Sequence, residues 1–520
     1  MKYFSTRGDS ERLSFEDTVL TGLAPNGGLY IPEHIPTLPS DWQEKWKSHS
    51  FVDLSVEVLS LYISEDEISR DDLRKLVEKS YSTFRHPDIT PLQKLNEKLF
   101  VLELFHGPTF AFKDVALQLL GNLFEFFLAR RNAKKSSGEP KEKLTVVGAT
   151  SGDTGSAAIY GLRNKENVSI FILHPKGRVS PIQQAQMATI TDANVHNIAV
   201  KGTFDDCQDT VKALFGDREF NEKHRLGAVN SINWARILAQ TVYYFLSYFH
   251  VQAISPGARI QYVVPTGNFG DVLAGYYAKR MGLPMDKLVV ATNSNDILAR
   301  FWKTGKYERV ELGAETVAAL TNGAPDGKES VVAVKETLSP AMDILVSSNF
   351  ERLLWYLAYE AEGTGSVDAA CVVVDGWMKS VKSDGRVEVP RKVLELAKRD
   401  FTAERVSDDQ TLATIRRFYE SEPSYIADPH TAVGLTAAQI IASEPISNPS
   451  PIRVSLSTAH PAKFSEAVAE ALASFPAFNF DRDVLPEEFQ GLLQKEQRVI
   501  EVGSADVDLV KNVIESKVSA

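Results

Sequence analysis

The sequence predicts an α/β protein with two parallel-sheet domains and an N-terminal helix-rich domain. From about residue 96, short β-branched runs are each followed by a small polar turn and a helical pattern, as in KLTVVGATSGDTGSAAIYGL and IQYVVPTGNFGDVLAGYYAKRM. Repeated units of strand, loop and helix indicate parallel strands covered by helices. The preceding residues are instead polar and rich in helical patterns, apart from an extended Gly/Pro segment, GLAPNGGLYIPEHIPTLP.

The length of the chain and the changes in its residue pattern also predict its division into domains. At 520 residues it exceeds one ordinary domain, so two or three are expected. We predict an N-terminal domain over residues 1–95 and a small α/β domain over residues 136–235. A large α/β domain would comprise residues 96–135 and 236–520, with excursions at about 300–420 in which no motif can be assigned.

The composition is that of a globular protein with ample core, since 43% of the residues are hydrophobic and 24% are charged. The formal charge of −11 argues against nucleic acid or an anionic membrane surface as a general partner. Any anionic ligand must therefore be held by a local site.

No feature of the sequence predicts secretion or a membrane span. The N-terminus is charged from the start, and the longest apolar run, Ile237 to Ile254, is interrupted by polar residues, so we interpret it as a buried helix. Cys207 and Cys371 have neither metal-ligand spacing nor a disulfide framework, which fits a reducing compartment. We expect a cytoplasmic protein.

The stretch LELFHGPTFAFKDVALQLL is interpreted as a strand, Leu99 to Leu104, a Gly-Pro turn and a helix that begins near Phe112. Lys113 lies on the side of this helix that is predicted to face the core, and in its first turn, where the helix dipole disfavours a cation. Either its ammonium reaches water along apolar surface, or burial lowers its pKa and makes it an amine able to form a Schiff base. Polar residues at helical spacing predict the solvent-exposed stripe of the same helix: Asp114, Gln118, Asn122 and Glu125.

A glycine-containing turn follows the strand in VVPTGNFGDVLAGYY. Successive backbone N–H groups at the start of the next helix suit one phosphate group. The turn lacks the Gly-Lys-Ser/Thr of a Walker loop and the third glycine of the dinucleotide fingerprint, and an ordinary α/β turn is the alternative. Its residues are Gly267, Asn268, Phe269 and Gly270.

Two further strand ends are rich in hydroxyl groups. In GATSGDTGSAA, four polar residues could present donors to a carboxylate or phosphate, although one or two of them would be explained by a helix N-cap: Ser151, Asp153, Thr154 and Ser156. In SLSTAHPAKF, the last strand ends on a similar group, for which a capped helix start is again the alternative: Ser457, Thr458, His460 and Lys463.

The segment VNSINWARILAQ places Asn233 before a helix and Arg236 in its first turn, where a cation is poorly placed for the dipole. Either a ligand anion or a buried carboxylate would offset that charge. Lys176 and Arg178, in HPKGRVSP, are expected at the solvated surface. No two of the ten histidines have metal-ligand spacing, so we predict no metal site, and no Gly-x-Ser-x-Gly elbow of the common hydrolases occurs.

Together, a helix-start lysine after a strand, a turn for one phosphate and a hydroxyl-rich strand end suit pyridoxal 5'-phosphate. The lysine would hold the aldehyde, the turn the phosphate, and a hydroxyl group the ring nitrogen.

Five motifs in this order, HGPTFAFKD, ATSGDTGSAA, NSINWARI, PTGNFGD and STAHPAKF, closely resemble threonine synthases of the fungal and bacterial type. The opening RGDSERLSFEDTVLTGLAPNGGLYIPEHIP and the later DPHTAVG fit the same family, so the resemblance covers essentially the whole chain. It implies the tryptophan-synthase-β-like fold (fold type II) of pyridoxal-phosphate enzymes. It also implies conversion of O-phospho-L-homoserine and water into L-threonine and phosphate, by a monomer or homodimer.

The resemblance further implies a role for individual residues. The Schiff-base lysine falls on Lys113, and the hydroxyl group at the pyridine nitrogen falls on Thr458. The cofactor phosphate falls on the turn made of Gly267, Asn268, Phe269, Gly270 and Asp271. Six residues would face the substrate: Ser151, Asp153, Thr154, Asn233, Arg236 and Lys463.

Two other functions compete with this interpretation. A phospholyase with the same cofactor would release phosphate, ammonia and an oxo acid, because water would not add at Cβ. A non-catalytic protein that binds a phosphorylated ligand would show no imine absorption band.

Overall fold

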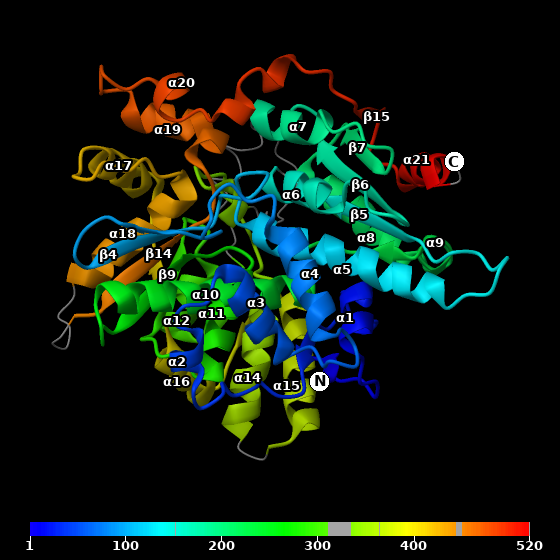
Figure 1. The fold of residues 1–520 in the computed structure, drawn as a ribbon, viewed down its shortest axis with the longest axis horizontal. Coiled ribbons are helices and arrows are strands. Elements are labelled where there is room, and N and C mark those ends of the chain that lie inside the picture. The colour runs from blue at the N-terminus through cyan, green and yellow to red at the C-terminus, as the bar shows by residue number, and fades with distance from the viewer. Residues whose placement is uncertain (151, 310–333, 363–364, 444–449, 519–520) are drawn as a thin grey trace.

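A six-stranded sheet forms the centre of one half of the molecule, at the left of Figure 1. The computed structural model describes residues 1–150, 152–309, 334–362, 365–443 and 450–518. The strands are parallel except for the antiparallel edge strand β3. Their order is β13 (Phe401–Arg405), β10 (Leu288–Thr292), β9 (Ile260–Pro265), β14 (Ile452–Ser457), β4 (Leu99–Glu103) and β3 (Leu92–Lys94).

Helices cover both faces of this sheet because successive strand residues point to opposite sides. Phe100 and Leu102 of β4 pack in the same core as α10 (Trp234–Ile254) and α11 (Gly270–Met281). Leu99 and Val101 pack in a second core on the opposite face. That face carries α17 (Asp408–Tyr419), α18 (Pro429–Ser443) and α19 (Ser465–Leu472).

A five-stranded, fully parallel sheet forms the other half, at the right of Figure 1. In the chain, α6 (Asp153–Leu162) follows β5 and α7 (Pro181–Ala188) follows β6. Helices α8 (Phe204–Gly216), α9 (Arg218–His224) and α21 (Val507–Val518) pack together at its outer side. The strand order is β15 (Ile500–Val502), β7 (Val195–Val200), β6 (Val168–Pro175), β5 (Leu144–Ala149) and β8 (Leu226–Gly227).

The C-terminal end of the chain departs from the predicted domain division. The sequence placed residues 236–520 in the large domain, whereas β15 pairs with β7 and α21 packs on α8 within the small-sheet half. The edge of β7 has unpaired backbone N–H and C=O groups, and β15 forms hydrogen bonds with them. The sequence of a strand as short as β15 does not indicate which sheet it joins.

The N-terminal region combines helices with a small two-stranded antiparallel sheet and packs on α10, so its apolar side chains belong to the main core. It comprises β1 (Tyr3–Ser5), α1 (Phe15–Thr21), β2 (Tyr30–Pro32), α2 (Trp42–Trp46), α3 (Phe51–Ser60) and α4 (Arg70–Tyr81). The excursion after β10 comprises α12 (Ile297–Thr304), β11 (Lys306–Glu308), α14 (Phe350–Glu362), α15 (Val367–Ser383), β12 (Arg386–Glu388) and α16 (Arg391–Asp400).

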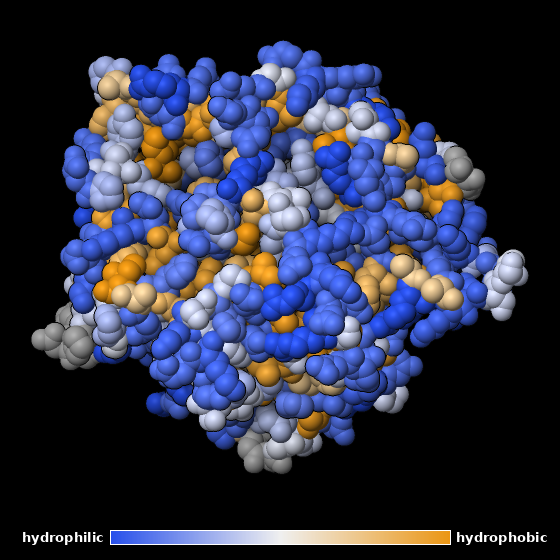
Figure 2. Space-filling view, viewed as in Figure 1, coloured by the Kyte–Doolittle hydropathy of each residue, from blue (hydrophilic) through white to orange (hydrophobic). Residues whose placement is uncertain are grey.

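The face of the molecule seen in Figure 2 is mainly hydrophilic, with hydrophobic areas between the hydrophilic ones. The predicted buried helix over residues 237–254 is confirmed as α10, whose side chains are buried except near its C-terminal end. Within the described part of the chain, no helix is both long and apolar enough to span a membrane.

Helix α5 (Lys113–Ala133) differs from the prediction in one respect. Asp114, Gln118 and Asn122 were expected to be exposed, but all three are buried. The reason is that α5 lies between α4, α6 and α10 and is enclosed on several sides. The side chains of Asp114 and Asn122 bond within the protein instead, as when Asn122 Nδ2 donates to Ser80 Oγ over 2.8 Å.

Helices α5 and α6 approach so closely that only glycine fits between them. A Cβ atom on Gly121 would lie 1.9 Å from the carbonyl oxygen of Gly161, and one on Gly161 would lie 2.4 Å from that of Leu117. Contact between backbones therefore sets the distance between the two helices.

We expect Gly121→Val to lower the free energy of unfolding by about 3 kcal/mol, because the new side chain must push α6 away. The control is Gly376→Ala in α15, where a Cβ meets no atom within 4 Å. That change should stabilise the protein by about 0.5–1 kcal/mol, since alanine is the better helix former. Denaturant unfolding of both variants measures the difference, and equal stability would contradict the close-contact argument.

Candidate active site

Three neighbouring strands of the large sheet end at one edge, and each is followed by a predicted site residue. Lys113 follows β4, Thr458 follows β14, and the turn at Gly267 follows β9, in the sheet order β9-β14-β4. The Phe112 amide donates to the Thr458 carbonyl over 2.8 Å and so holds the start of α5 against the end of β14. Ligands of open α/β sheets bind at such edges.

Lys113 is the first residue of α5 and only 9% exposed. Its Nζ lies 4.0 Å from Asp153 Oδ2. Burial lowers its pKa to about 8, with Arg236 and Lys463 acting in the same direction and Asp153 opposing them. A much larger fraction of this amine is therefore neutral and nucleophilic near neutral pH than for an ordinary lysine, in line with the second of the two sequence-based interpretations.

Asp153, the first residue of α6, binds a second lysine as well. Its Oδ1 accepts from Lys463 Nζ over 2.9 Å and from Gln183 Nε2 over 2.8 Å. Burial by itself would raise its pKa, but Lys463 and Lys113 hold that pKa well below its ordinary value. Lys463 also donates to the Thr109 carbonyl over 2.8 Å, within its own half of the molecule. The ion pair between Lys463 and Asp153 therefore joins that half to the half that contains α6.

Arg236 lies in the first turn of α10 and is only 2% exposed. Its Nη1 donates to the Val229 carbonyl over 2.8 Å, and its Nε has no partner among the described residues. Burial lowers its pKa to about 10. No ion pair with a carboxylate is found for Arg236 within the described residues, so the alternative of a buried Arg–carboxylate pair has no support here.

The other residues predicted to face the substrate are placed differently. The Asn233 side chain is fully buried, caps α10 by accepting from the Ala235 amide, and donates to the Val19 carbonyl over 2.9 Å. Because both of its polar atoms are occupied, these contacts do not favour a substrate role. Thr154 is half-buried in the first turn of α6, and Ser151 lies outside the described residues.

The turn after β9 has the features of a phosphate site. Phe269 adopts the left-handed conformation, with φ 63°. None of the amides of residues 267–270 donates to a described protein acceptor, which leaves consecutive N–H groups at the start of α11. The positive φ of the turn lies at Phe269 and not at Gly270.

Asp271 does not join the turn through its carboxylate. That group is buried and accepts hydrogen bonds from the hydroxyl groups of Tyr243 over 2.5 Å and Tyr244 over 3.0 Å. Burial raises its pKa to about 7, against these two bonds. The side chain therefore fastens α11 to α10, and only the backbone of Asp271 remains near the turn.

Sequence reasoning missed the segment that holds this turn, in the excursion where no motif could be assigned. Ser347 Oγ donates to the Gly267 carbonyl over 2.6 Å, and Asn349 donates to the Asn268 carbonyl from both its backbone and its side chain. Because the carbonyl groups are bound on this side, the amides are free to face a ligand. Only long-range contacts reveal this segment, since serine and asparagine are common in any loop.

These residues fit pyridoxal phosphate. A buried amine of lowered pKa, a strand-end threonine bonded through its backbone to the residue before that amine, and a turn of unpaired amides all lie at one sheet edge. Lys113 would hold the aldehyde, residues 267–270 the phosphate, and Thr458 the ring nitrogen.

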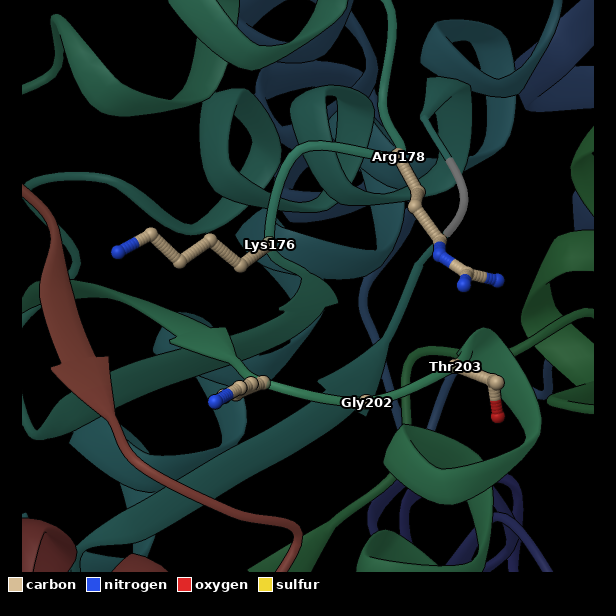
Figure 3. Close-up of a pocket in the computed structure, with 5 residues that line it drawn as sticks. Lys176, Arg178, Gly202 and Thr203 are labelled. Atoms are coloured by element: carbon tan, nitrogen blue, oxygen red, sulfur yellow. The ribbon is translucent and has the colours of Figure 1, made fainter.

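The loops after β6 and β7 line a separate open pocket of about 570 Å³ (Figure 3). Figure 3 shows Arg178 extending toward Thr203, whereas Lys176 points away from both. Lys176 Nζ binds Glu501 Oε2 over 2.7 Å, and both basic residues are exposed. They form a solvated surface, as the sequence predicted.

Comparison with known proteins first defines the class. A family model described as pyridoxal-phosphate dependent enzyme matches residues 84–349. Models described as threonine synthase N terminus and threonine synthase, C-terminal, match residues 2–81 and 431–514. The chain is thus a pyridoxal-phosphate-dependent enzyme with two parallel sheets.

Individual relatives narrow the class. Threonine synthase of Schizosaccharomyces pombe is 57% identical over 520 residues, which span 100% of this chain and 98% of that protein. The crystal structure of threonine synthase from yeast superposes with a TM-score of 0.92, at 50% identity, over 100% of this chain and 99% of that one. A pyridoxal-phosphate-bound threonine synthase from Brucella melitensis superposes with a TM-score of 0.85, at 40% identity, over the whole of both chains. This chain belongs to the threonine synthase family.

We expect Asp153→Asn to lower the pKa of Lys113 below about 8, because the carboxylate that opposes burial is lost. The pKa of Lys113 is about 8 in the folded protein and 10.5 in the unfolded chain. Between these two pH values the unfolded chain binds more protons than the folded protein, so stability rises with pH through this range. In the variant the window begins at lower pH, so the apoprotein should be less stable at neutral pH.

The pH dependence of acylation of Lys113 in the apoprotein, followed by mass spectrometry, gives the midpoint directly. Gln183→Leu, which removes a neutral partner of Asp153, is the control and should move the midpoint less. An unchanged midpoint in Asp153→Asn would show that the carboxylate does not act on this amine.

Proposed function

We propose that this site converts O-phospho-L-homoserine and water into L-threonine and phosphate. The observation that carries the proposal is an excess of buried positive charge. Lys113, Lys463 and Arg236 lie near two carboxyl groups, Asp153 and Asp114. Burial raises the pKa of Asp114 to about 6, against its two hydrogen bonds from Thr109.

An uncompensated buried charge is costly, and an anionic ligand offsets that cost. A phosphorylated amino acid brings both a carboxylate and a phosphate. Arg236, whose guanidinium has one protein acceptor and an unpartnered Nε, is the residue best supplied with spare donors for one of them. Lys463 and Thr154 are the other candidates at this edge.

When bound, pyridoxal phosphate draws electrons from the substrate Cα and so makes the α- and β-protons removable. Lys113 is the residue placed to move those protons, because its amine has a pKa of about 8 and can both accept and return a proton near neutral pH. Thr458 contributes a neutral hydroxyl group at the ring nitrogen, which does not hold that nitrogen protonated as a carboxylate would.

We also propose that the protein acts in the cytoplasm as a monomer or homodimer. Two free, buried cysteines, Cys207 and Cys371, are consistent with a reducing compartment. Size-exclusion chromatography with light scattering gives the oligomeric state.

Incubation of the pure protein with O-phospho-L-homoserine tests the reaction, with threonine, phosphate and oxo acid assayed together. Equal amounts of threonine and phosphate are expected. Phosphate with an oxo acid and no threonine would identify a phospholyase instead, and no product at all would favour a binding protein.

Lys113→Ala is expected to abolish turnover and the imine absorption band of the cofactor, because no other amine replaces it. The fold should persist, and the apoprotein should be at least as stable as wild type near neutral pH, because a buried amine of lowered pKa is removed and no well-packed apolar group is lost. Absorption spectra, turnover and thermal melting on one preparation check all three expectations. Near-normal threonine production by this variant would overturn the assignment of Lys113.

Arg236→Leu is expected to lower kcat/KM for O-phospho-L-homoserine by roughly 10- to 100-fold, through a higher KM or a lower kcat. This is the effect of losing a hydrogen bond to a charged group. Binding of pyridoxal phosphate should be retained. Arg453→Leu is the matched control, because Arg453 is also buried with unpartnered guanidinium atoms but lies at the opposite end of β14. A destabilised Arg236 variant with normal kinetics would exclude the substrate role.

A further inference from the structure

The motif DPHTAVG places a buried aspartate and histidine at the start of α18. Asp428 is fully buried and His430 is 3% exposed. Asp428 Oδ1 lies 2.9 Å from His430 Nδ1 and accepts from the His430 amide over 2.9 Å, and Oδ2 accepts from the Thr431 amide. Capping of α18 accounts for the two backbone contacts but leaves the imidazole contact unexplained.

The other ring nitrogen of His430 identifies what the imidazole holds. The Ala341 amide donates to His430 Nε2 over 3.1 Å. An amide can only donate, so Nε2 must be the acceptor and Nδ1 must carry the proton that is given to Asp428. The carboxylate therefore sets the tautomer in which the ring can bind Ala341. The ring also packs against Phe464, with centroids 4.7 Å apart.

Ala341 lies directly against the phosphate turn. It belongs to the short turn η1 (Pro340–Met342), and its carbonyl oxygen would be 2.8 Å from a Cβ on Gly267. Such close packing means that a shift of η1 is transmitted to the Gly267 backbone. Ser347, a few residues after η1, binds the Gly267 carbonyl from the same segment.

The same carboxylate also reaches the strand end that precedes Thr458. Asp428 Oδ2 accepts from the Thr431 hydroxyl group, whose oxygen lies 2.8 Å from Ser457 Oγ. Asp428 is thus connected through His430 to the turn at one end of the proposed cofactor site, and through Thr431 to the strand end at the other.

We propose that Asp428 and His430 are positioning residues, which hold η1 against Gly267 and so keep the amides of residues 267–270 aligned for the cofactor phosphate. The proposal rests on the placement of pyridoxal phosphate under Proposed function. It assigns His430 no contact with cofactor or substrate. The contact of His430 is with the phosphate end alone, so its loss should affect binding of the phosphate, which a purely structural role would not single out.

Two substitutions of His430 separate the roles of its two nitrogens. The amide of His430→Asn can replace Nδ1 as donor to Asp428 but does not reach Ala341. His430→Gln instead places an oxygen where Nε2 accepts the Ala341 amide. Both variants should fold, because Asn293 Nδ2 also holds this segment, through Thr337, Ser339 and Asp343.

The experiment measures the binding of pyridoxal phosphate and of pyridoxal, which lacks the phosphate, to the full chain freed of cofactor. We expect His430→Asn to raise the Kd for pyridoxal phosphate about tenfold and to leave the Kd for pyridoxal within about twofold, while His430→Gln stays within about threefold of wild type for both. Thermal melting of each apoprotein shows whether folding is intact.

The inference is overturned if His430→Asn weakens both ligands equally, if it weakens neither, or if His430→Gln loses as much affinity as His430→Asn. Gly270→Val tests the underlying site. A Cβ there meets only ordinary contacts, 3.5 Å from Ile237 and 3.6 Å from Asn349, so the new side chain should crowd the phosphate more than the fold. If Gly270→Val keeps the full preference for pyridoxal phosphate over pyridoxal, the turn does not hold the phosphate and the cofactor placement itself fails.

Discussion

The contact between Gly121 of α5 and Gly161 of α6 is the constraint on which the site depends. The two glycines lie equally far from the starts of their helices, and the helices run side by side in the same direction. The starts of the helices are therefore brought together as well, which places Lys113 4.0 Å from Asp153. Because backbone contact allows little adjustment, this distance is determined by packing rather than by attraction between the charges.

Charge then decides what the site can bind. Asp153 lies within ion-pair distance of two lysines, Lys113 and Lys463. Arg236 is buried and donates to one protein acceptor, the Val229 carbonyl, so the site holds more positive than negative charge. This excess of buried charge lowers the free energy of unfolding of the ligand-free protein. An anion that binds only the folded state offsets part of that loss. Burial lowers the pKa of Lys113, and the positive charges of Arg236 and Lys463 add to this effect, while Asp153 opposes it.

The excursion between β10 and β13 contributes the part of the site that is farthest from the recognisable motifs. Its residues 337–349 bind the carbonyl side of the Gly267 turn, and the Asp428–His430 pair fastens that segment from α18. A phosphate turn of bare backbone needs such support, because its own short sequence fixes neither the direction of its amides nor their spacing.

Local pattern was sufficient for the features that depend on a few neighbouring residues. Strand–turn–helix units predicted the parallel sheets, and the apolar run from Ile237 predicted α10. Lys113, Thr458 and the Gly267 turn were predicted as site residues from their motifs, and each lies after a strand of the large sheet. Asp114, Gln118 and Asn122 were predicted to be exposed because helical spacing cannot report that α5 is enclosed by other helices. Likewise, only the assembled fold decided that the Asn233 side chain is occupied in capping α10, that Asp271 bonds to Tyr243 and Tyr244, and that β15 joins the small sheet. Each of these outcomes depends on partners remote in sequence or on free edges and donors that tertiary packing alone supplies.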